Sequence, residues 1–276
     1  MSTLKKILIK TRRQVFSEIA GNNPSIFQGE GFDFVELREY NYGDDTRHID
    51  WNVTAKMQKP YVKIFKEERE LNIVVVSVLG GNVWFGRKKF KQETIAETVA
   101  LLGYSTVKNG DRFSSYIYTD KLEQITPPSK SIHSVRKATQ SVLEFPALGK
   151  RVDADTLPRL LFERIKRRSI IFVIADFFDT FDFKLLSKKH EVIALIVRDS
   201  LEERPEEMGL VNLYDPQTMR TSLLQLDRKT VQTYAKTVRE RNITLYKDFH
   251  KNKIAFARIF THEEPFAKLS KLFMGR

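Results

Sequence analysis

The sequence contains no cysteine, and this absence excludes several classes of protein at once. Without a thiol there is no disulfide framework, no thiolate zinc or iron–sulfur site and no cysteine nucleophile. The longest apolar runs, such as residues 170–175 and 192–197, have the length of strands and fall well short of the ~18 residues that a membrane span requires. The basic N-terminus lacks the apolar segment of a secretory signal. We therefore expect a cytoplasmic protein with no membrane span.

The sequence also lacks the residue patterns of common catalytic and cofactor sites. Its five histidines have neither the H-x₃-H nor the H-E-x-x-H spacing of a zinc site. Residues 80–89 contain glycines and basic residues between a strand and a helix, where a phosphate can bind, but they match no phosphate or dinucleotide motif. Asp176 and Asp179 have no nucleophile partner, so an unrecognised hydrolase is a minor alternative. The sequence predicts no cofactor and no enzymatic activity.

Positive charge is the strongest bias of the composition. There are 47 basic and 35 acidic residues, which gives a net charge of +12 and a pI near 9.7. The basic residues are interleaved with Asp and Glu along the chain, so a solvated surface with a positive bias is the favoured explanation. The alternative is a protein that binds nucleic acid or another anionic surface, which predicts one clustered basic face and binding that weakens steeply with salt.

From residue 71 onward, apolar or β-branched runs alternate with helical segments. Runs of this kind are typical of parallel strands that are covered on both faces. They predict an α/β domain with a doubly wound, mostly parallel sheet, in which ligands bind at the carboxyl ends of the strands near the topological switch point. Residues 199–227 are loop-rich, with small strands. The expected strands are 73–79, 113–118, 122–125, 170–175, 192–197 and 254–260, and the expected helices are 88–108, 132–143, 156–166, 183–188, 228–249 and 263–273.

The first 70 residues have a different character. Residues 1 to about 28 predict an amphipathic helix that ends at the turn signal of residues 21–24. Residues 29–70 predict short extended pieces with turns, and no helix. We therefore divide the chain into an N-terminal helix with a β-rich arm, residues 1–70, and an α/β domain, residues 71–276.

The arm carries a long motif that is specific enough to identify a family. Its sequence reads Gly-Glu-Gly-Phe-Asp-Phe at 29–34, Leu-Arg-Glu-Tyr at 37–40 and a near-continuous polar and aromatic stretch at 43–56. The stretch 189–199, which ends in Val-Arg-Asp, matches as well. Together these segments closely resemble the signature of the bacterial domain-of-unknown-function family 58.

The resemblance implies a von Willebrand A-like α/β domain preceded by an N-terminal helix and a β-rich arm. It also implies a partner, a MoxR-type AAA+ ATPase, and a role in protein complex assembly or maturation with no enzymatic reaction. Many relatives carry membrane helices before the signature, whereas this chain begins shortly upstream of it, so we expect a soluble version. The arm residues expected to form the interaction motif are Gly31, Phe34, Arg38, Tyr40, Gly43, Asp44, Arg47, Asp50 and Trp51.

The charged residues of this motif have two interpretations. Arg38 and Arg47 can pair with Asp44 and Asp50 and so fix an irregular segment that has few ladder hydrogen bonds. The same cluster, with its tyrosines and Trp51, can form a docking surface, because Tyr, Trp and Arg dominate the hot spots of interfaces. The two interpretations are compatible.

The chain departs from the family pattern where a divalent cation would bind. Relatives carry Asp-x-Ser-x-Ser after the first strand of the domain, and the matching positions here are Ser77, Leu79 and Gly81. A hard cation needs oxygen ligands, which the side chains of leucine and glycine cannot supply. Asp176 matches the aspartate of a later metal loop and stands without the others. We therefore expect a degenerate, metal-free site.

Overall fold

A computed structural model describes residues 2–17, 34–42, 44, 46–65 and 70–274. The chain forms two compact units: the main domain, residues 1–27 with 71–276, and the arm, residues 28–70. The expected boundary at residue 70 groups the N-terminal helix with the arm, whereas α1 (Thr3–Ser17) belongs to the main domain. The reason is burial, because Ile7 and Val15 of α1 join the apolar core of that domain.

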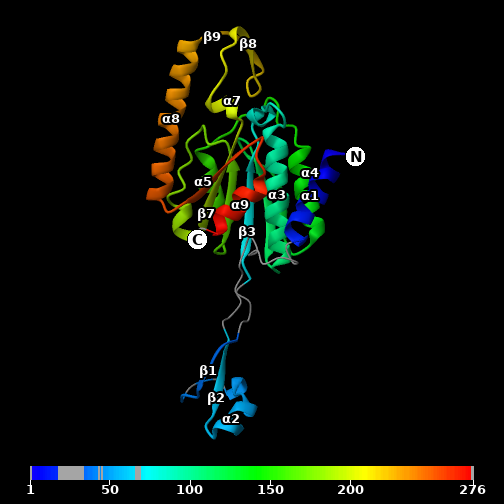
Figure 1. The fold of residues 1–276 in the computed structure, drawn as a ribbon, viewed down its shortest axis with the longest axis vertical. Helices are drawn as coiled ribbons and strands as arrows, with labels where there is room; N and C mark the ends of the chain where they lie inside the picture. Colours follow the sequence, from blue (N-terminus) through cyan, green and yellow to red (C-terminus); the bar gives the residue numbers. More distant parts are fainter. Residues whose placement is uncertain (1, 18–33, 43, 45, 66–69, 275–276) are drawn as a thin grey trace. The chain divides into compact units, whose positions relative to one another are not determined.

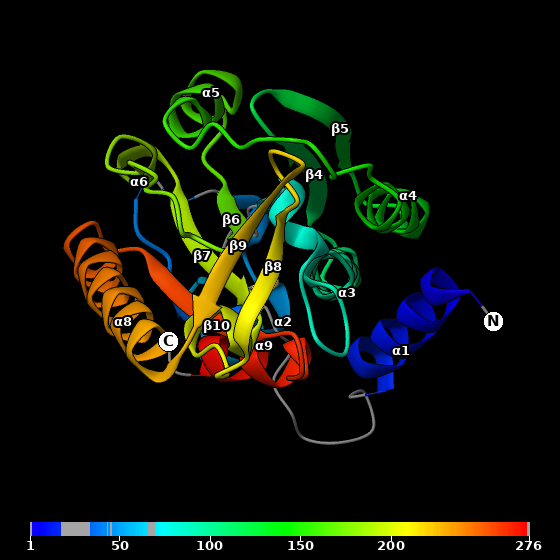
Figure 2. The same ribbon diagram turned by 90° about the horizontal axis from the view of Figure 1, so that it is seen from above.

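The main domain is built on a six-stranded sheet with the order β10-β7-β6-β3-β4-β5 (Figures 1 and 2). Only β5, at one edge, is antiparallel to its neighbour. Counted within this sheet, the order is the doubly wound 3-2-1-4-5-6, and its switch point lies between β3 and β6. This confirms the predicted α/β fold class. The strands are β3 (Asn72–Val78), β4 (Arg112–Tyr118), β5 (Leu122–Ser129), β6 (Ile170–Ala175), β7 (Glu191–Arg198) and β10 (Ala255–Phe260).

Helices cover both faces of this sheet, which explains why the inner strands β3, β6 and β7 are apolar with little alternation (Figure 2). On β3, for example, Val75 points into one core and Val76 into the other. No described helix combines the length and apolar character that a membrane crossing demands. One core includes α1, α3 (Lys91–Lys108), α4 (Ile132–Leu143) and α9 (Pro265–Met274), and the other includes α5 (Thr156–Arg164), α6 (Leu186–Lys189) and α8 (Arg228–Lys251).

Two boundaries differ from the sequence prediction for local reasons. The strand expected at 122–125 continues through Pro127 and Pro128, which is tolerated because β5 is an edge strand with a neighbour on one side only. The helix expected from residue 88 begins at Lys91, and Phe90, expected in the core, is its exposed N-cap residue. A short 3-10 helix, η3 (Gly81–Trp84), precedes it.

The segment expected to be loop-rich contains a regular β-hairpin. After the short helix α7 (Ser200–Glu203), β8 (Gly209–Asp215) pairs antiparallel with β9 (Arg220–Leu226) over seven residue pairs. The turn of this hairpin is attached to the loop between α4 and α5, because Gly149 N donates to Pro216 O at 2.9 Å. At position 81 a Cβ atom would lie 2.0 Å from Pro216 O, so only glycine fits beneath the turn.

The arm contains a small two-stranded sheet and one helix. Strand β1 (Phe34–Glu39) pairs antiparallel with β2 (Tyr61–Phe65), as the extended pattern predicted. The prediction that the arm has no helix is wrong, because α2 (Trp51–Met57) lies between these strands, after the 3-10 turn η2 (Thr46–His48). Asp50 starts α2 by accepting hydrogen bonds from the backbone of the first turn.

Candidate functional site

The candidate site lies at the switch point of the main sheet, where β3 and β6 run side by side and end at the same edge. Ser77 is paired in register with Ile174, so the segment that follows β3 emerges beside Asp176, the first residue after β6. The chain leaves β3 through η3 and returns in α3. The fold thus brings together the two segments that the sequence singled out.

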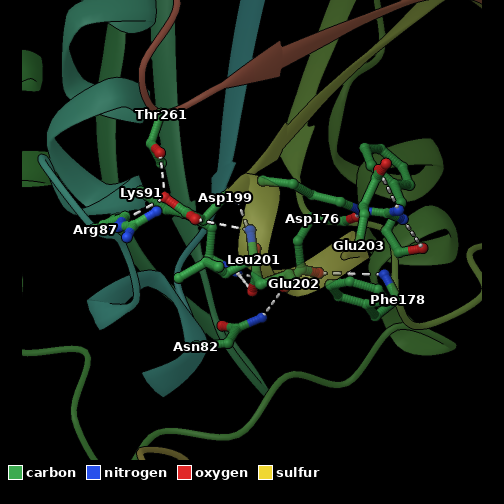
Figure 3. Close-up of polar contacts among 12 residues, drawn as sticks. Asn82, Arg87, Lys91, Asp176, Phe178, Asp199, Leu201, Glu202, Glu203 and Thr261 are labelled. Carbon is green, nitrogen blue, oxygen red and sulfur yellow. Dashed lines mark hydrogen bonds and ion pairs between the residues drawn. The ribbon is translucent and has the colours of Figure 1, made fainter. Parts of the chain in front are cut away.

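The carboxylate of Asp176, which follows β6, forms hydrogen bonds with η3, with the start of α3 and with its own loop (Figure 3). Its Oδ2 accepts hydrogen bonds from Asn82 Nδ2 and from Lys91 Nζ, the second at 3.1 Å. Its Oδ1 accepts from the backbone N of Phe178 at 3.3 Å. Asn82 belongs to η3 and Lys91 is the first residue of α3, so one carboxylate links the ends of β3, β6 and the following helix.

Lys91 is buried although it is charged, since its side chain is 1% exposed. Its Nζ lies 2.6 Å from Glu202 Oε1, in addition to the contact with Asp176. Burial acts to lower the pKa of Lys91, but the charges of Asp176 and Glu202 outweigh burial and raise this pKa above its ordinary value. The ammonium group is therefore protonated at neutral pH.

Burial raises the pKa of Glu202, against the effect of the Lys91 charge. The two directions are compatible because burial penalises both charges, whereas Lys91 has two carboxylates beside it and Glu202 has one ammonium. The other oxygen of Glu202, Oε2, accepts from the backbone N of Asp199 at 2.8 Å and completes the capping box of α7.

Asp199 extends the network from β7 to β10, the strand at one edge of the sheet. Its carboxylate accepts hydrogen bonds from Leu201 N at 3.0 Å, from Arg87 N at 3.1 Å and from the hydroxyl of Thr261. Burial alone would raise the pKa of Asp199, but these three donors hold it below its ordinary value. Asp199 therefore remains ionised and connects β7 to the loop before α3 and to the end of β10.

Arg198 holds the backbone that follows β6. It is 1% exposed, and its guanidinium donates to Asp176 O at 2.7 Å and to Phe177 O at 3.2 Å. Phe177 has a φ of 54°, a left-handed conformation that these hydrogen bonds help to maintain. The same guanidinium also binds Glu203 of α7 and Asn242 of α8. The backbone at Asp176 is thus held by Arg198, and its carboxylate is held by Asn82 and Lys91.

The space beside these groups is small. A cavity of about 10 Å³ lies against Asp176, Asp179 and Lys91, with room for about one water molecule. Burial and the charge of Asp176 raise the pKa of Asp179. A cavity of this size holds no organic substrate.

The positions that match the metal motif have the following surroundings. The hydroxyl of Ser77 is buried and has no hydrogen-bond partner among the described residues. Leu79 is fully buried in the apolar core, and Gly81 lies under the hairpin turn. Within the described part of the chain, no group of three or more His, Asp or Glu side chains is arranged to hold a metal ion. Leu79 and Gly81 therefore supply no side-chain oxygen to a divalent cation.

Comparison with known proteins identifies the family. The family model described as "Protein of unknown function DUF58" matches residues 36–244. The chain belongs to the DUF58 family. Over 225 residues it is 23% identical to the uncharacterized protein Rv1480 of Mycobacterium tuberculosis and to the uncharacterized protein Mb1516 of Mycobacterium bovis. Each alignment covers 79% of this chain and 71% of the relative. The family resemblance stated from the arm motif is thus confirmed.

Solved structures of similar α/β proteins were also found. The conserved hypothetical protein BatB from Bacteroides thetaiotaomicron matches with 12% identity and a TM-score of 0.49, over 74% of this chain and 98% of that chain. An aerotolerance-related membrane protein from Bacteroides fragilis matches with 10% identity and a TM-score of 0.47, over 75% and 100%. The SpRpn10 VWA domain matches with 8% identity and a TM-score of 0.37, over 75% and 95%.

The DUF58 motif residues in the arm form a local polar structure. Arg38 and Asp44 make an ion pair of 2.8 Å, and Asp44 also accepts from Asn41 N at 2.8 Å. Asp50 caps α2 by accepting from Asn52 N and Val53 N at 3.0 and 3.1 Å.

The other motif residues are distributed around this polar structure. Tyr40 N donates to Pro60 O. Trp51 is exposed, and so is Tyr42, two residues after Tyr40. Phe34 begins β1 and Arg47 lies in η2, whereas Gly31 and Gly43 lie outside the described residues. The expected pairing of arginine with aspartate is therefore seen for Arg38 and Asp44.

Sequence reasoning gave no role at the switch point to three residues of this DUF58 network: Lys91, and also Arg198 and Glu202, which it placed only in the family match. Lys91 stands in a run of lysines that looks like a solvated helix start. Arg198 had a signal, because a charged residue directly follows the apolar run 192–197. Glu202 had one too, since Asp199-x-x-Glu202 has the spacing of a capping box.

Proposed function

We propose that this chain is a non-enzymatic adaptor that binds a MoxR-type AAA+ ATPase and serves the assembly or maturation of protein complexes, without a functional metal site. The observation that carries the proposal is an exposed apolar hairpin next to the switch point. Exposed apolar surface that is contiguous on a folded domain is typical of a protein-binding site. The exposed apolar side chains of this hairpin are Met208, Leu210, Leu213, Tyr214, Met219, Leu223 and Leu224.

The hairpin is well placed for binding a partner. Leu223 is paired with Asn212, two residues from Leu210, so Leu210 and Leu223 lie on the same face of the two-stranded sheet, and they are 63% and 66% exposed. A two-stranded sheet also leaves both outer edges open to pairing with another chain. The turn is held to the α4–α5 loop of the main domain through Pro216, so the hairpin presents these side chains with less loss of conformational freedom on binding.

The absence of enzymatic activity is part of the proposal, and two features support it. The carboxylates of Asp176 and Glu202 are engaged with Lys91 and with backbone amides, so neither is free to act as a general base. The adjoining cavity holds about one water molecule. An interaction role needs neither a free base nor a substrate cavity.

The identity of the ATPase and the cellular location come from the family resemblance. A MoxR-type ATPase consumes ATP, so the proposed complex belongs in the cytoplasm. The arm supplies a second candidate contact, because Tyr42 and Trp51 are exposed on the same unit that carries the Arg38–Asp44 ion pair. In this view the charged motif residues shape the arm and its aromatic residues contact the partner.

A pull-down with the purified ATPase from the same source tests this proposal. The variant L210S/L223S removes two exposed apolar side chains, so we expect binding to weaken at least about tenfold, or ~1.4 kcal/mol. The control L185S makes the same chemical change at a 61% exposed leucine before α6, and it should bind like the unmodified protein. Binding should persist in a chelator. Equal binding by L210S/L223S would contradict the role of the hairpin.

The same experiment tests the alternative from net charge. Recovery of nucleic acid or ribosomal material from the source, lost at raised salt and with no ATPase bound, would favour an anionic partner. Retention of the ATPase at raised salt would favour the adaptor, because apolar contacts do not weaken with ionic strength.

A further inference from the structure

We infer that the ammonium group of Lys91 is a built-in cation that occupies the place of a divalent metal at the switch point. The inference deepens the metal-free part of the proposed function and rests on it. It concerns the chemistry of this site and leaves open which partner binds. It is based on the position of the ammonium, on the side chains around it and on the packing of the hairpin turn against position 81.

The ammonium lies where the carboxylates of two segments converge (Figure 3). Its distances to Asp176 Oδ2 and Glu202 Oε1 are 3.1 and 2.6 Å. These two side chains follow two neighbouring parallel strands, since Asp176 comes directly after β6 and Glu202 lies in α7 after β7. Two carboxylates that converge in a buried place repel each other unless a cation lies between them. Lys91 provides that cation from within the chain.

The remaining donors do not complete the coordination shell of a metal. Leu79 is buried in the core, and position 81 cannot carry a serine side chain while Pro216 lies above it. The Ser77 hydroxyl and Asn82 Oδ1 are buried and have no hydrogen-bond partner among the described residues. A hard cation prefers about six oxygen ligands, and in this chain the ammonium fills the central position instead.

The substitution changes how a partner can bind at this face. A bound metal with an open position can accept a carboxylate from a partner, whereas an ammonium with two internal carboxylates has no such open position. Binding therefore has to use the surface around the site, which includes the hairpin. A further consequence is that the charge at this site does not depend on the supply of metal.

The variant K91A tests the inference with Mn²⁺ as the probe. Without the ammonium, Asp176 Oδ2 and Glu202 Oε1 lose their cation and Asn82 Oδ1 is available, so the site becomes an oxygen site suited to Mn²⁺. In metal-free buffer we expect the melting temperature to fall by at least about 6 °C. We expect 1 mM Mn²⁺ to raise it again by about 3 °C, which corresponds to a Kd of roughly 0.1 mM.

This measurement has two controls. The unmodified protein should show no shift with Mn²⁺ and no bound Mn²⁺ by electron paramagnetic resonance. The variant K89A removes the neighbouring lysine, which is also paired with a glutamate, Glu97, and should not gain Mn²⁺ binding. Tight Mn²⁺ binding by the unmodified protein, or none by folded K91A, would overturn the inference.

A second variant keeps the test decisive if K91A does not fold. K91A/E202Q removes one cation and one anion, so its melting temperature should lie above that of K91A in metal-free buffer and should not respond to Mn²⁺. Failure of K91A/E202Q to fold would mean that Lys91 acts by packing, and would overturn the inference. Neither readout involves the ATPase, so an incorrect partner and an incorrect view of Lys91 give different results.

Discussion

Two ion clusters in this protein use the same chemistry in opposite surroundings. In the main domain, Lys91 lies buried between Asp176 and Glu202, whereas in the arm Arg38 pairs with Asp44 at the surface. A buried charge that loses its partner stays desolvated, so breaking the first cluster is costly. A surface charge is solvated again by water, so breaking the second costs little. Burial, more than geometry, decides how much each cluster matters to stability.

We expect the largest loss of stability when the guanidinium of Arg198, which holds the backbone next to the buried cluster, is removed. R198M leaves the carbonyls of Asp176 and Phe177 without their donor and Asn242 without its partner. We expect the free energy of unfolding in urea to fall by about 3–5 kcal/mol. The control R159M breaks an exposed ion pair with Glu163 and should change it by less than about 0.5 kcal/mol. Equal effects of the two variants would refute the comparison.

A smaller effect is expected from disturbing the cover of the buried cluster. In G81A the new methyl group would lie 2.0 Å from Pro216 O, so the hairpin turn has to move. We expect a loss of about 1–3 kcal/mol in thermal or urea unfolding, and faster proteolysis of the hairpin. G110A, at a glycine with a φ of 80° and open space, is the control for strain without a clash. Equal resistance of the hairpin to proteolysis in G81A and in the unmodified protein would show that the turn does not pack against position 81.

Acid should act on the main domain through Asp199. The folded pKa of Asp199 is below its ordinary value of 3.8, because donors such as Thr261 outweigh burial. Its carboxylate therefore stabilises the fold above about pH 4, and this stabilisation is lost as the pH falls through the folded pKa. At pH 7, D199N should melt about 2–4 °C lower, for a loss of ~1 kcal/mol. The difference should shrink in scans toward pH 2, and a constant difference would count against this assignment.

The smallest effect is expected in the arm. A hydrogen bond from Asn41 N and the pairing with Arg38 hold the pKa of Asp44 below its ordinary value, the same direction as for Asp199. Asp44 is solvated, however, so D44N should leave the melting temperature unchanged and should alter only the chemical shift of the Asn41 amide. A melting shift as large as that of D199N would mean that the direction of the pKa shift, and not burial, sets the cost.

The sheet could be predicted from the sequence because its strands are buried on both faces. Residues 170–175 and 132–143 were expected with the boundaries that β6 and α4 have. The hairpin was expected only as small strands, since both of its faces are largely exposed and its pattern is not that of a buried strand. Helix α2 was missed because it has no buried residue and depends on the cap at Asp50.

The candidate site could be located from the sequence but not assembled. Leu79 and Gly81 predicted a departure from the metal motif, and the segment that contains them lies beside Asp176 in the structure. The role of Lys91 could not be read, because nothing in a run of basic residues tells which one is buried. That information lies in the tertiary structure, which brings Glu202 from far along the chain to within 2.6 Å of its ammonium group.

The most direct test of the central claim is an anomalous diffraction map from crystals of the unmodified protein grown with Mn²⁺. The account predicts no manganese peak between Asp176 and Glu202, and density for the Lys91 side chain that ends there. A strong manganese peak at that position, with Lys91 turned away, would contradict it.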